Sequence, residues 1–500
     1  MNLNLDIQQF KEIAKDYNVI PVYKEILLDI DTPLSVFLKI AQPDRFNFIL
    51  ESVEKADQKG RYSFIGSSEN FYIRTKGEYF EIYNRGKIDY RITKDPIGEL
   101  KKLLTGIKPF KDGNLPPFWG GYVGYIGYDV INFYEPVGDK NPDNLGIPDI
   151  YFFLSDEVIA FDNLKNSIKI IVSAFVENNP EEAFYTAVKK IDNIEERLNR
   201  EIEIDRIPLK DISKEPSGWK SNFTKEDFLN AVVKSKRYIE DGDIIQVVLS
   251  QRFYRRLNTE PLNVYRTIRY INPSPYLFYL DFKDIKVVGS SPEILVTVKD
   301  GKILTKPIAG TRPRGKTEEE DRKLKEDLLQ DAKEKAEHLM LVDLARNDVG
   351  KVSKAGTVKV DKFMYVENYS HVMHIVSDVS GELREGLHPI DVLKSVFPVG
   401  TVSGAPKVRA MQIISELEPE KRNIYAGAVG YISFDGNLDT AIAIRTAIIV
   451  NNTVYVQAGA GIVADSVPEK EYEETVNKAK AMMKAIEMAE GQTLTESSPT

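Results

Sequence analysis

The chain has 500 residues, of which 42% are hydrophobic and 29% charged, and its formal net charge is −9 at pH 7. These fractions are typical of a globular protein, and the negative charge argues against nucleic acid or an anionic membrane as the main partner. Cysteine is absent, which excludes disulfides, thiolate metal ligands and a cysteine nucleophile. The first residues lack the basic start and apolar run of a signal peptide, and the apolar stretch 441–450 is interrupted by Arg445 and too short to span a bilayer. We therefore expect a cytoplasmic protein.

The first part of the chain has the pattern of a β-rich domain. Between residues 22 and 176, short apolar runs alternate with Gly, Asn and Asp turns, which predicts mostly antiparallel strands with a few helices. Residues 180–200 have a charged helical pattern, and the polar, proline-containing segment 201–219 is the best candidate for a linker. We accordingly predict an N-terminal domain over residues 1–210.

The second part begins with a capped helix. Thr224 precedes a helical pattern over 225–241, and Gly242 then leads into a predicted strand over 244–249. We predict a catalytic domain over 220–490, followed by a polar tail, residues 491–500, that is expected to be disordered.

Two segments in different halves of the chain resemble each other. The sequence GYVGYIGYD at 121–129 matches GAVGYISFD at 427–435 at six positions in the same register. Repeated glycine in a strand pattern indicates a close approach of backbones. The match suggests related strands in the two halves, although two similar glycine-rich strands can also arise independently.

An arginine-rich glycine turn and two carboxylate pairs predict an anion site next to a metal site. The turn PIAGTRPRG occupies 307–315 and offers backbone N–H groups and guanidinium to an anion. Glu334 and Glu337 follow at i, i+3 on a predicted helix, and Glu471 and Glu474 have the same spacing on another, with Ser466 as its predicted N-cap. Carboxylates at this spacing can converge on Mg²⁺, whereas the alternative is two solvated helix faces.

Further candidates lie on the remaining glycine turns and one predicted strand. His371 and His374 stand on opposite faces of that strand, so one of them can face a pocket as an acid or base, the alternative being a histidine with a structural hydrogen bond. Residues 397–407 have the pattern of a strand-to-helix turn that offers N–H groups to an anion. Arg445 is expected inside an apolar strand, where a buried cation needs an anionic partner.

Together these segments resemble the chorismate-utilising enzymes, most closely their anthranilate synthase component I branch. The resemblance rests on four motifs in this order: PIAGTRP at 307–313, LVDLARND at 341–348, GTVSGAPK at 400–407 and QAGAGI at 457–462. It covers residues 222–488 strongly and the N-terminal half more weakly. It implies an α+β fold in which large, mostly antiparallel sheets pack together with helices outside.

The resemblance also implies a reaction and roles for single residues. Chorismate and ammonia would give anthranilate and pyruvate via aminodeoxyisochorismate, the first committed step of tryptophan biosynthesis. Glu337 and Glu474 would hold Mg²⁺ on the ring carboxylate, and Glu334 and Glu471 would bridge to it through water. Glu293 would protonate the departing hydroxyl, His374 would assist the loss of pyruvate, and Thr401 would position the ring. The remaining substrate-binding candidates are Gly310, Thr311, Tyr425, Arg445, Gly459, Gly461 and Lys478.

Two positions distinguish the branches of this family. Isochorismate and salicylate synthases have a lysine at the position of Gln246, and aminodeoxychorismate synthase has one at the position of Ala309. Neither lysine is present here, which favours direct addition of ammonia. The alternatives are an aminodeoxychorismate synthase component I and, in another class, a catalytically inactive regulator that binds an amino acid.

The resemblance further implies a partner and a regulator. A chain without cysteine lacks the usual glutaminase nucleophile, so a glutamine amidotransferase subunit, anthranilate synthase component II, is expected to supply ammonia. L-Tryptophan is expected as a feedback inhibitor, bound by Glu51, Ser52, Pro273, Pro275, Tyr276 and Leu277. On residue types alone these segments also fit an ordinary strand end and a rigid turn.

Overall fold

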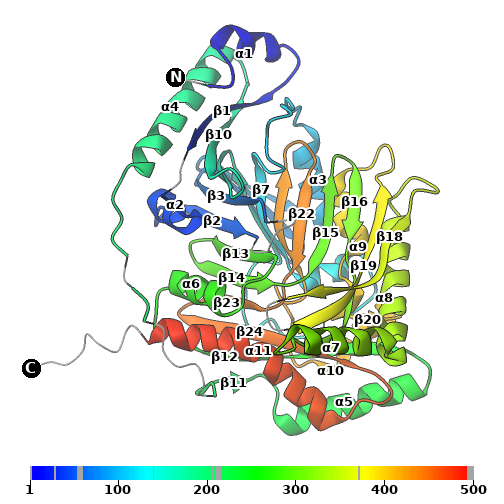
Figure 1. The fold of residues 1–500 in the computed structure, drawn as a ribbon. Coiled ribbons are helices and arrows are strands. Elements are labelled where there is room, and N and C mark those ends of the chain that lie inside the picture. Colours follow the sequence, from blue (N-terminus) through cyan, green and yellow to red (C-terminus); the bar gives the residue numbers. More distant parts are fainter. Residues whose placement is uncertain are drawn as a thin grey trace, which may run out of the picture.

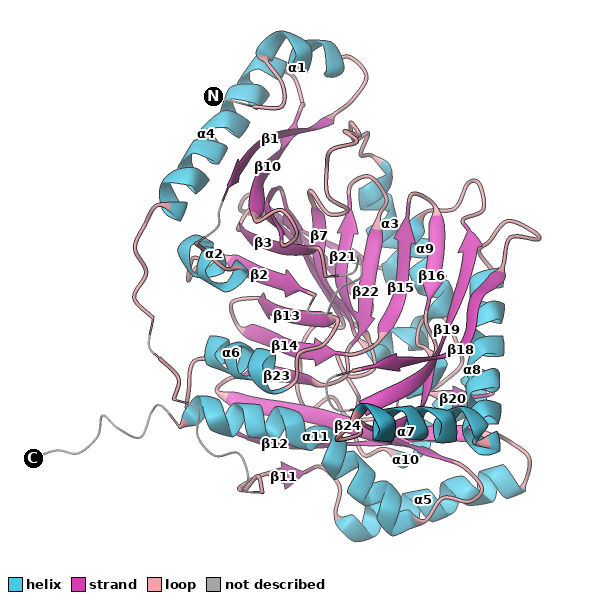
Figure 2. Ribbon diagram, in the orientation of Figure 1, coloured by secondary structure: helices cyan, strands magenta, loops and turns pink. Residues whose placement is uncertain are grey.

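The computed structural model describes residues 3–27, 30–52, 60–138, 140–204, 206–208, 215–369 and 372–491. Within them the chain forms two large antiparallel sheets whose strands cross steeply, with helices on the outer faces (Figures 1 and 2). The α+β fold with packed antiparallel sheets is therefore confirmed. None of the helices in the described part is long and apolar enough to cross a membrane. The predicted disordered tail lies outside the described residues, apart from Gly491.

The first sheet contains strands from both ends of the chain. Its order is β1 (Val19–Leu27), β10 (Ser167–Phe175), β9 (Glu157–Asp162), β3 (Tyr62–Ser68), β2 (Phe46–Glu51), β13 (Tyr276–Asp281), β14 (Ile285–Ser291), β23 (Thr446–Val450), β24 (Thr453–Ile462), β12 (Gln246–Arg256) and β11 (Lys220–Ser221), with β20 (Gly404–Ala405) paired to β12.

The second sheet likewise contains strands from both halves of the chain. Its order is β17 (Ile308–Pro313), β19 (Val372–Glu382), β16 (Lys302–Thr305), β15 (Ile294–Lys299), β22 (Leu438–Ile442), β21 (Ala428–Ser433), β7 (Gly121–Ile126), β8 (Ile150–Ser155), β4 (Phe71–Lys76), β5 (Tyr79–Asn84) and β6 (Lys87–Ile92), with β18 (Lys359–Asn368) paired to β19. Both halves of the chain thus share both sheets, and the division at 210–220 stays a prediction.

The helices begin and end at residues that the local sequence explains. They are α1 (Ile7–Ile13), α2 (Pro33–Ile40), α3 (Pro96–Thr105), α4 (Pro180–Leu198), α5 (Lys225–Glu240), α6 (Pro261–Ile271), α7 (Glu318–Gln330), α8 (Ala332–Gly350), α9 (Pro389–Val396), α10 (Lys407–Leu417) and α11 (Pro468–Glu490), with short 3₁₀ helices η1 (Tyr128–Phe133) and η2 (Gly400–Val402). Thr224 caps α5 by accepting from the Asp227 N–H, as predicted.

The two glycine-rich segments that resemble each other are neighbouring strands. β7 and β21 pair antiparallel at the centre of the second sheet, with Gly124 opposite Gly430. A Cβ at Gly124 would lie 2.0 Å from the Tyr151 carbonyl oxygen, and one at Gly430 would lie 2.1 Å from that of Asp439. The predicted close approach of backbones is confirmed within each half, and across the halves a Cβ at Gly121 would lie 2.1 Å from the Ile432 carbonyl oxygen.

An aromatic core fills the space between the sheets. Its buried side chains include Phe46, Phe48, Phe64, Phe118, Trp119, Phe153, Phe278 and Phe282. Separate apolar clusters lie under the helices, with α1, α2, α4, α6 and α11 over the first sheet and α3, α8 and α9 over the second. Three layers of apolar packing therefore hold the sheets at a fixed crossing.

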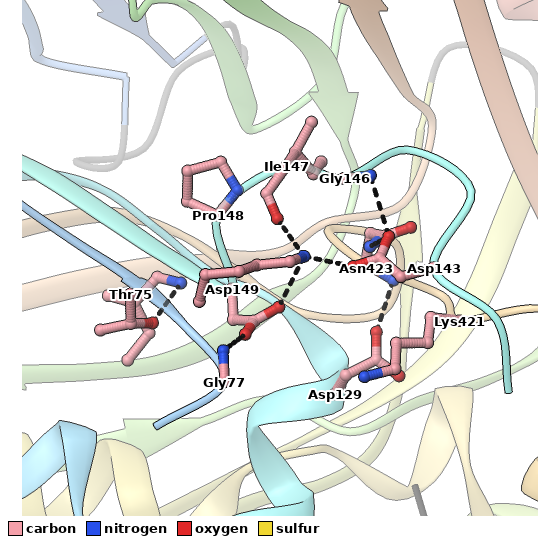
Figure 3. A network of polar contacts seen from close by, with 12 residues as sticks. Thr75, Gly77, Asp129, Asp143, Gly146, Ile147, Pro148, Asp149, Lys421 and Asn423 are labelled. Carbon is pink, nitrogen blue, oxygen red and sulfur yellow. Dashed lines mark hydrogen bonds and ion pairs between the residues drawn. The ribbon is translucent and has the colours of Figure 1, made fainter. Parts of the chain in front are cut away.

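A polar network fastens the N-terminal strands to a C-terminal turn (Figure 3). Asn423 donates from its backbone N–H to Asp129 over 2.7 Å and from its amide to Asp143 over 3.0 Å. Asp143 also forms an ion pair with Lys76, which donates to Asp149 as well. Because the turn around Asn423 leads directly to Tyr425, this network connects the first half of the chain to the functional site described next.

Candidate functional site

The predicted catalytic and substrate-binding residues gather where the two sheets meet. Gln246, Gly459 and Gly461 come from the first sheet, and Gly310, Thr311 and His374 from the second. The others lie on connecting segments and one helix, namely Glu293, Thr401, Tyr425, Arg445 and Lys478. Burial lowers the pKa of His374 and the charges of Arg445 and Lys478 lower it further, while Lys478 also opposes the rise that burial causes in the pKa of Glu293. One site is therefore assembled from distant parts of the chain.

Glu293 is a buried carboxyl between β14 and β15. Burial raises its pKa from 4.5 to about 8, while Thr401 and Lys478 oppose the rise. The carboxyl is therefore protonated at neutral pH and can donate a proton. Thr401 Oγ1 faces it, yet this buried hydroxyl has no partner in hydrogen-bond geometry among the described residues. Glu293 and Thr401 both line a cavity of about 30 Å³.

His374 on β19 has a defined tautomer. Its Nδ1 lies 2.9 Å from the carbonyl oxygen of Gly310 and 3.1 Å from Thr311 Oγ1. A carbonyl can only accept, so Nδ1 carries the proton and Nε2 of the neutral ring is left as a base. Burial lowers the pKa of the ring, which keeps it neutral. His371 lies outside the described residues, so the predicted arrangement of the two histidines on opposite faces is not tested.

Arg445 differs in backbone from the prediction. It lies between β22 and β23, where the chain crosses from one sheet to the other, with φ of 50°, and not inside a strand. A positive φ is uncommon for a residue other than glycine, so this crossing is a constrained turn. No carboxylate of the described chain forms an ion pair with it, and burial lowers its pKa while Tyr425 opposes that effect. A half-buried guanidinium with no carboxylate partner in the described chain can receive an anion, and this role of Arg445 stays a prediction.

Two glycines of β24 leave room for their neighbours in the site. A Cβ at Gly461 would lie 2.5 Å from Gln246 Nε2, and one at Gly459 would lie 2.8 Å from the Tyr425 hydroxyl. Lys478 on α11 donates to the Gly459 carbonyl over 3.0 Å. Gln246, Tyr425 and Lys478 therefore each contact β24 at one of these two glycines.

The four predicted metal-binding carboxylates lie on α8 and α11. Burial raises the pKa of Glu337, and the charges of Glu334 and, across the helices, Glu471 raise it further. Burial and Glu474 likewise raise the pKa of Glu471. In the described residues no three acidic or histidine side chains converge as a ready-made metal site, and Glu474 forms an ion pair with Lys478 over 2.7 Å. The half-buried excess of negative charge shared by two helices nevertheless fits a divalent cation with oxygen ligands.

Two local predictions around the site are wrong. The segment 397–407 joins helix α9 to helix α10 through η2 and β20, and not a strand to a helix. Ser466 does not cap α11, because Val467 holds that position and Ser466 Oγ instead accepts from the Val463 N–H. Pro468 does open the helix.

The sequence analysis missed a buried ion pair next to the site. Arg422 and Glu418 are 1% and 3% exposed in their side chains and are joined over 2.6 Å. Arg422 donates to the carbonyl oxygens of Val402 and Val248, both over 2.7 Å, and its guanidinium lies over the rings of Tyr128 and Tyr425. The pair therefore holds the turn that carries Thr401 and the ring of Tyr425. The sequence signal that could have revealed this pair is an Arg four residues after a Glu at the end of a predicted helix.

Removing one partner of this pair is expected to destabilise the fold strongly. Glu418→Ala leaves the Arg422 cation buried without compensation, at a cost of about 3–5 kcal/mol. The matched control is Glu416→Ala, whose exposed carboxylate lies two residues away and accepts from the Tyr238 hydroxyl, with an expected cost of about 1 kcal/mol or less. Chemical denaturation measures both, and equal losses would contradict a structural role for the pair.

A second cavity, of about 410 Å³, lies between the two sheets. Five of the six residues predicted to bind tryptophan line it, namely Glu51, Ser52, Pro275, Tyr276 and Leu277, whereas Pro273 does not. The Glu51 carboxylate already bonds Arg269 over 2.9 Å and the Tyr265 hydroxyl. Ile294, the residue after Glu293, lines both this cavity and the one beside Glu293. The two cavities therefore share a wall.

Comparison with known proteins gives a consistent result. One family model, described as chorismate binding enzyme, matches residues 46–484. The chain is 58% identical over 492 residues to anthranilate synthase component 1 of Aquifex aeolicus (strain VF5), covering 98% of this chain and 99% of that protein. It is 49% identical over 490 residues to the protein of the same name from Acetivibrio thermocellus, covering 97% and 98%.

Solved structures agree. The crystal structure of anthranilate synthase component I from Streptococcus pneumoniae TIGR4 matches with a TM-score of 0.77 at 39% identity, covering 92% of this chain and 99% of that chain. MenF, the menaquinone-specific isochorismate synthase from Escherichia coli, matches with a TM-score of 0.68 at 19% identity, covering 96% and 98%, which shows a shared fold alone.

Proposed function

The chain belongs to the chorismate-binding enzyme family, and from this premise we propose that it converts chorismate and ammonia to anthranilate and pyruvate, the first committed step of tryptophan biosynthesis. The observation that carries this proposal is the 58% identity to an anthranilate synthase component 1 over 98% of the chain. The site geometry supports it, because Arg445, which has no carboxylate partner in the described part of the chain, shares one junction with the protonated Glu293 and the neutral His374.

Each of these groups has a task in the proposed reaction. Arg445 and Tyr425 bind the enolpyruvyl carboxylate, with the backbone at Gly461 beside them. Glu293 donates its proton to the C4 hydroxyl, which leaves poorly until it is protonated. Ammonia adds at C2, and Nε2 of His374 then takes a proton as pyruvate leaves and the ring becomes aromatic. Thr401 positions the ring with its unpartnered hydroxyl.

Mg²⁺ is the proposed cofactor. Glu334, Glu337, Glu471 and Glu474 would hold it, and when bound it would supply positive charge to the ring carboxylate of chorismate. Burial raises the pKa values of Glu337 and Glu471, neighbouring carboxylates raise them further, and a bound cation would favour the charged forms.

Two side chains favour anthranilate over related products. Gln246 lies against Gly461 in the site and cannot act as the base that a lysine would provide for water. Ala309 on β17 has no amine that could attack the ring as a covalent nucleophile. The aminodeoxychorismate alternative is therefore disfavoured, and a regulator without activity is disfavoured because the acid, the histidine and the carboxylates are all present.

The nitrogen source gives a direct test. The purified chain should form fluorescent anthranilate from chorismate, Mg²⁺ and ammonia, but not from glutamine, because it has no cysteine to act as a glutaminase nucleophile. Addition of a glutamine amidotransferase subunit, the proposed partner, should restore the use of glutamine. Glutamine-dependent product from the chain alone would contradict the assignment of this partner, and absence of product with ammonia would contradict the reaction. The cytoplasmic location stays a prediction.

We further propose feedback inhibition by L-tryptophan bound in the cavity between the sheets. Its volume of about 410 Å³ and its lining by Pro275, Tyr276 and Leu277 suit an indole ring. Because the Glu51 carboxylate is engaged by Arg269 and Tyr265, we assign the ammonium group to the backbone at Ser52. Displacement of Ile294 by the ligand would move the adjacent Glu293, which supports a coupling of typical size, about 1–3 kcal/mol.

Ser52→Phe is expected to abolish this inhibition, because the phenyl ring would fill the cavity. Tryptophan should raise the apparent chorismate requirement of the wild type and leave that of the variant unchanged, measured as anthranilate formation at increasing tryptophan. Ser67→Ala, on β3 but outside the cavity lining, is the control and should be inhibited like the wild type. Equal inhibition of Ser52→Phe would place the regulator elsewhere.

A further inference from the structure

The last strand of the second sheet, β6, is a free and apolar edge. Among the described strands it pairs only with β5. All six of its residues are exposed, and Ile88, Tyr90 and Ile92 are 49%, 63% and 74% exposed, next to Tyr79 on β5 at 67%. Natural sheets usually cover or distort such an edge, because its unpaired backbone groups recruit another strand.

The backbone groups at this edge belong to the same residues as the apolar side chains. Arg85 and Gly86, with φ of 46° and 85°, form the two-residue turn between β5 and β6, so Asn84 and Lys87 are a hydrogen-bonded pair. In an antiparallel ladder, pairs that are hydrogen-bonded to each other alternate with pairs that are not. The same alternation reaches the far end of the strand, where the Thr93 N–H donates to the Glu78 carbonyl over 2.9 Å. The N–H and C=O groups of Ile88, Tyr90 and Ile92 therefore point to the free edge.

The two faces of β6 carry different chemistry. Ile88, Tyr90 and Ile92 stand on one face, since side chains two apart share a face. Asp89 and Arg91 stand on the other, where they bond each other over 3.1 Å and Arg91 also bonds Glu99 of α3 over 3.1 Å. A strand that paired with this edge would have to match an apolar row on one face and a negative and a positive charge on the other.

We propose that β6 pairs antiparallel with β6 of a second copy of this chain, about a two-fold axis at Tyr90. In this register Tyr90 faces the partner's Tyr90, and Ile88 faces the partner's Ile92. On the other face Asp89 faces the partner's Arg91, and the reciprocal pair repeats this contact. The backbone groups that point to the free edge meet each other, and the two sheets become continuous. The inference does not depend on the proposed function.

Charge selects this register over its neighbours. A slip by one residue would set the free backbone groups of one strand against residues whose groups already point to β5. A slip by two residues restores the backbone match but places the axis at residue 89 or 91, where Asp89 faces Asp89 or Arg91 faces Arg91. Directly opposed like charges destabilise a strand pair, and opposite charges stabilise it. Among these neighbouring registers, only the one with its axis at Tyr90 sets opposite charges against each other.

Charge reversal tests the register directly. Sedimentation velocity at increasing concentration should give the full-length chain a mass of twice 56.7 kDa. Asp89→Arg and Arg91→Asp each oppose like charges and should raise the dissociation constant at least tenfold. The double variant restores opposite charges and should dimerise like the wild type. An equimolar mixture of the two single variants should form the mixed dimer, because both of its pairs are complementary.

Two further variants separate register from folding. Lys87→Glu changes an exposed charge on the same strand that has no charged partner in the proposed dimer, so it should leave the dissociation constant unchanged. Tyr90→Pro removes an N–H that points to the free edge, so it should abolish dimerisation while β5 and β6 stay paired. Thermal unfolding curves like that of the wild type confirm that the variants fold.

Three results would overturn the proposal. The first is a wild-type mass of 56.7 kDa at every concentration. The second is dimerisation of the single charge reversals like that of the wild type, and the third is a mixture of the two single variants that stays monomeric. If the wild type is monomeric but binds the glutamine amidotransferase subunit, and Asp89→Arg abolishes this binding, the edge belongs to that subunit instead.

Discussion

Glu337→Gln and Glu474→Gln are expected to reduce Mg²⁺-supported turnover about 10²–10³-fold while the fold stays intact. Each change removes one negative charge from the group that would hold the cation, which is worth several kcal/mol of charge stabilisation in metal-dependent catalysis. Glu337 is half-buried on α8 beside Glu334, and Glu474 projects from α11. Turnover at increasing Mg²⁺ concentration measures the effect.

Matched controls are available on both helices. Glu473→Gln removes the neighbouring exposed carboxylate of α11, and Asp343→Asn removes one from the exposed face of α8. Both should keep wild-type turnover and Mg²⁺ dependence. Near-normal activity of Glu337→Gln at limiting Mg²⁺ would mean that the cation, if required, is held elsewhere.

Glu293→Gln is expected to lower kcat by about 10²–10⁴, the usual contribution of a general acid. The amide keeps the size of the protonated carboxyl but cannot give up a proton. In the wild type, activity should fall as the pH rises above about 8, the pKa to which burial raises Glu293. This alkaline loss should be absent from the residual activity of the variant, which a pH–rate profile measures.

Glu293→Gln is expected to lower activity but to raise the stability of the fold at alkaline pH. The folded state holds the proton on Glu293 up to about pH 8, whereas the unfolded chain releases it near 4.5. The wild type therefore loses stability as the pH rises between these values, by about 1.4 kcal/mol per unit of pKa shift at most. Glu293→Gln should avoid this loss and be the more stable protein at pH 8.

Glu157→Gln is the control for this experiment. Glu157 on β9 is a half-buried carboxyl whose pKa is also raised by burial, but it lines neither cavity of the site and pairs with Lys190 over 3.0 Å. Its replacement should leave kcat unchanged. An unaltered kcat in Glu293→Gln would remove Glu293 from the proposed acid role.

The sequence by itself determined the local structure and the chemical parts of the site. Thr224 predicted the start of α5 because its hydroxyl can satisfy an N–H of the first turn, and this depends on neighbours in the chain alone. The motifs around Gly310, Thr401 and Gly461 were enough to name the residues that meet at the junction. The glycine repeats predicted a close approach, since backbones that touch exclude a Cβ wherever they lie in the fold.

Only the tertiary structure decided how these parts act together. The strand pattern could not tell that β7 pairs with β21, because pairing between residues 300 positions apart leaves no local signal. Arg445 looks like a strand residue in sequence, yet it lies with a positive φ at the crossing between the sheets, where no carboxylate of the described residues pairs with it. The pKa of Glu293 depends on burial by segments from across the chain. Periodicity records which face of an element is apolar, whereas desolvation, charge pairing and a free sheet edge arise only when distant elements come together.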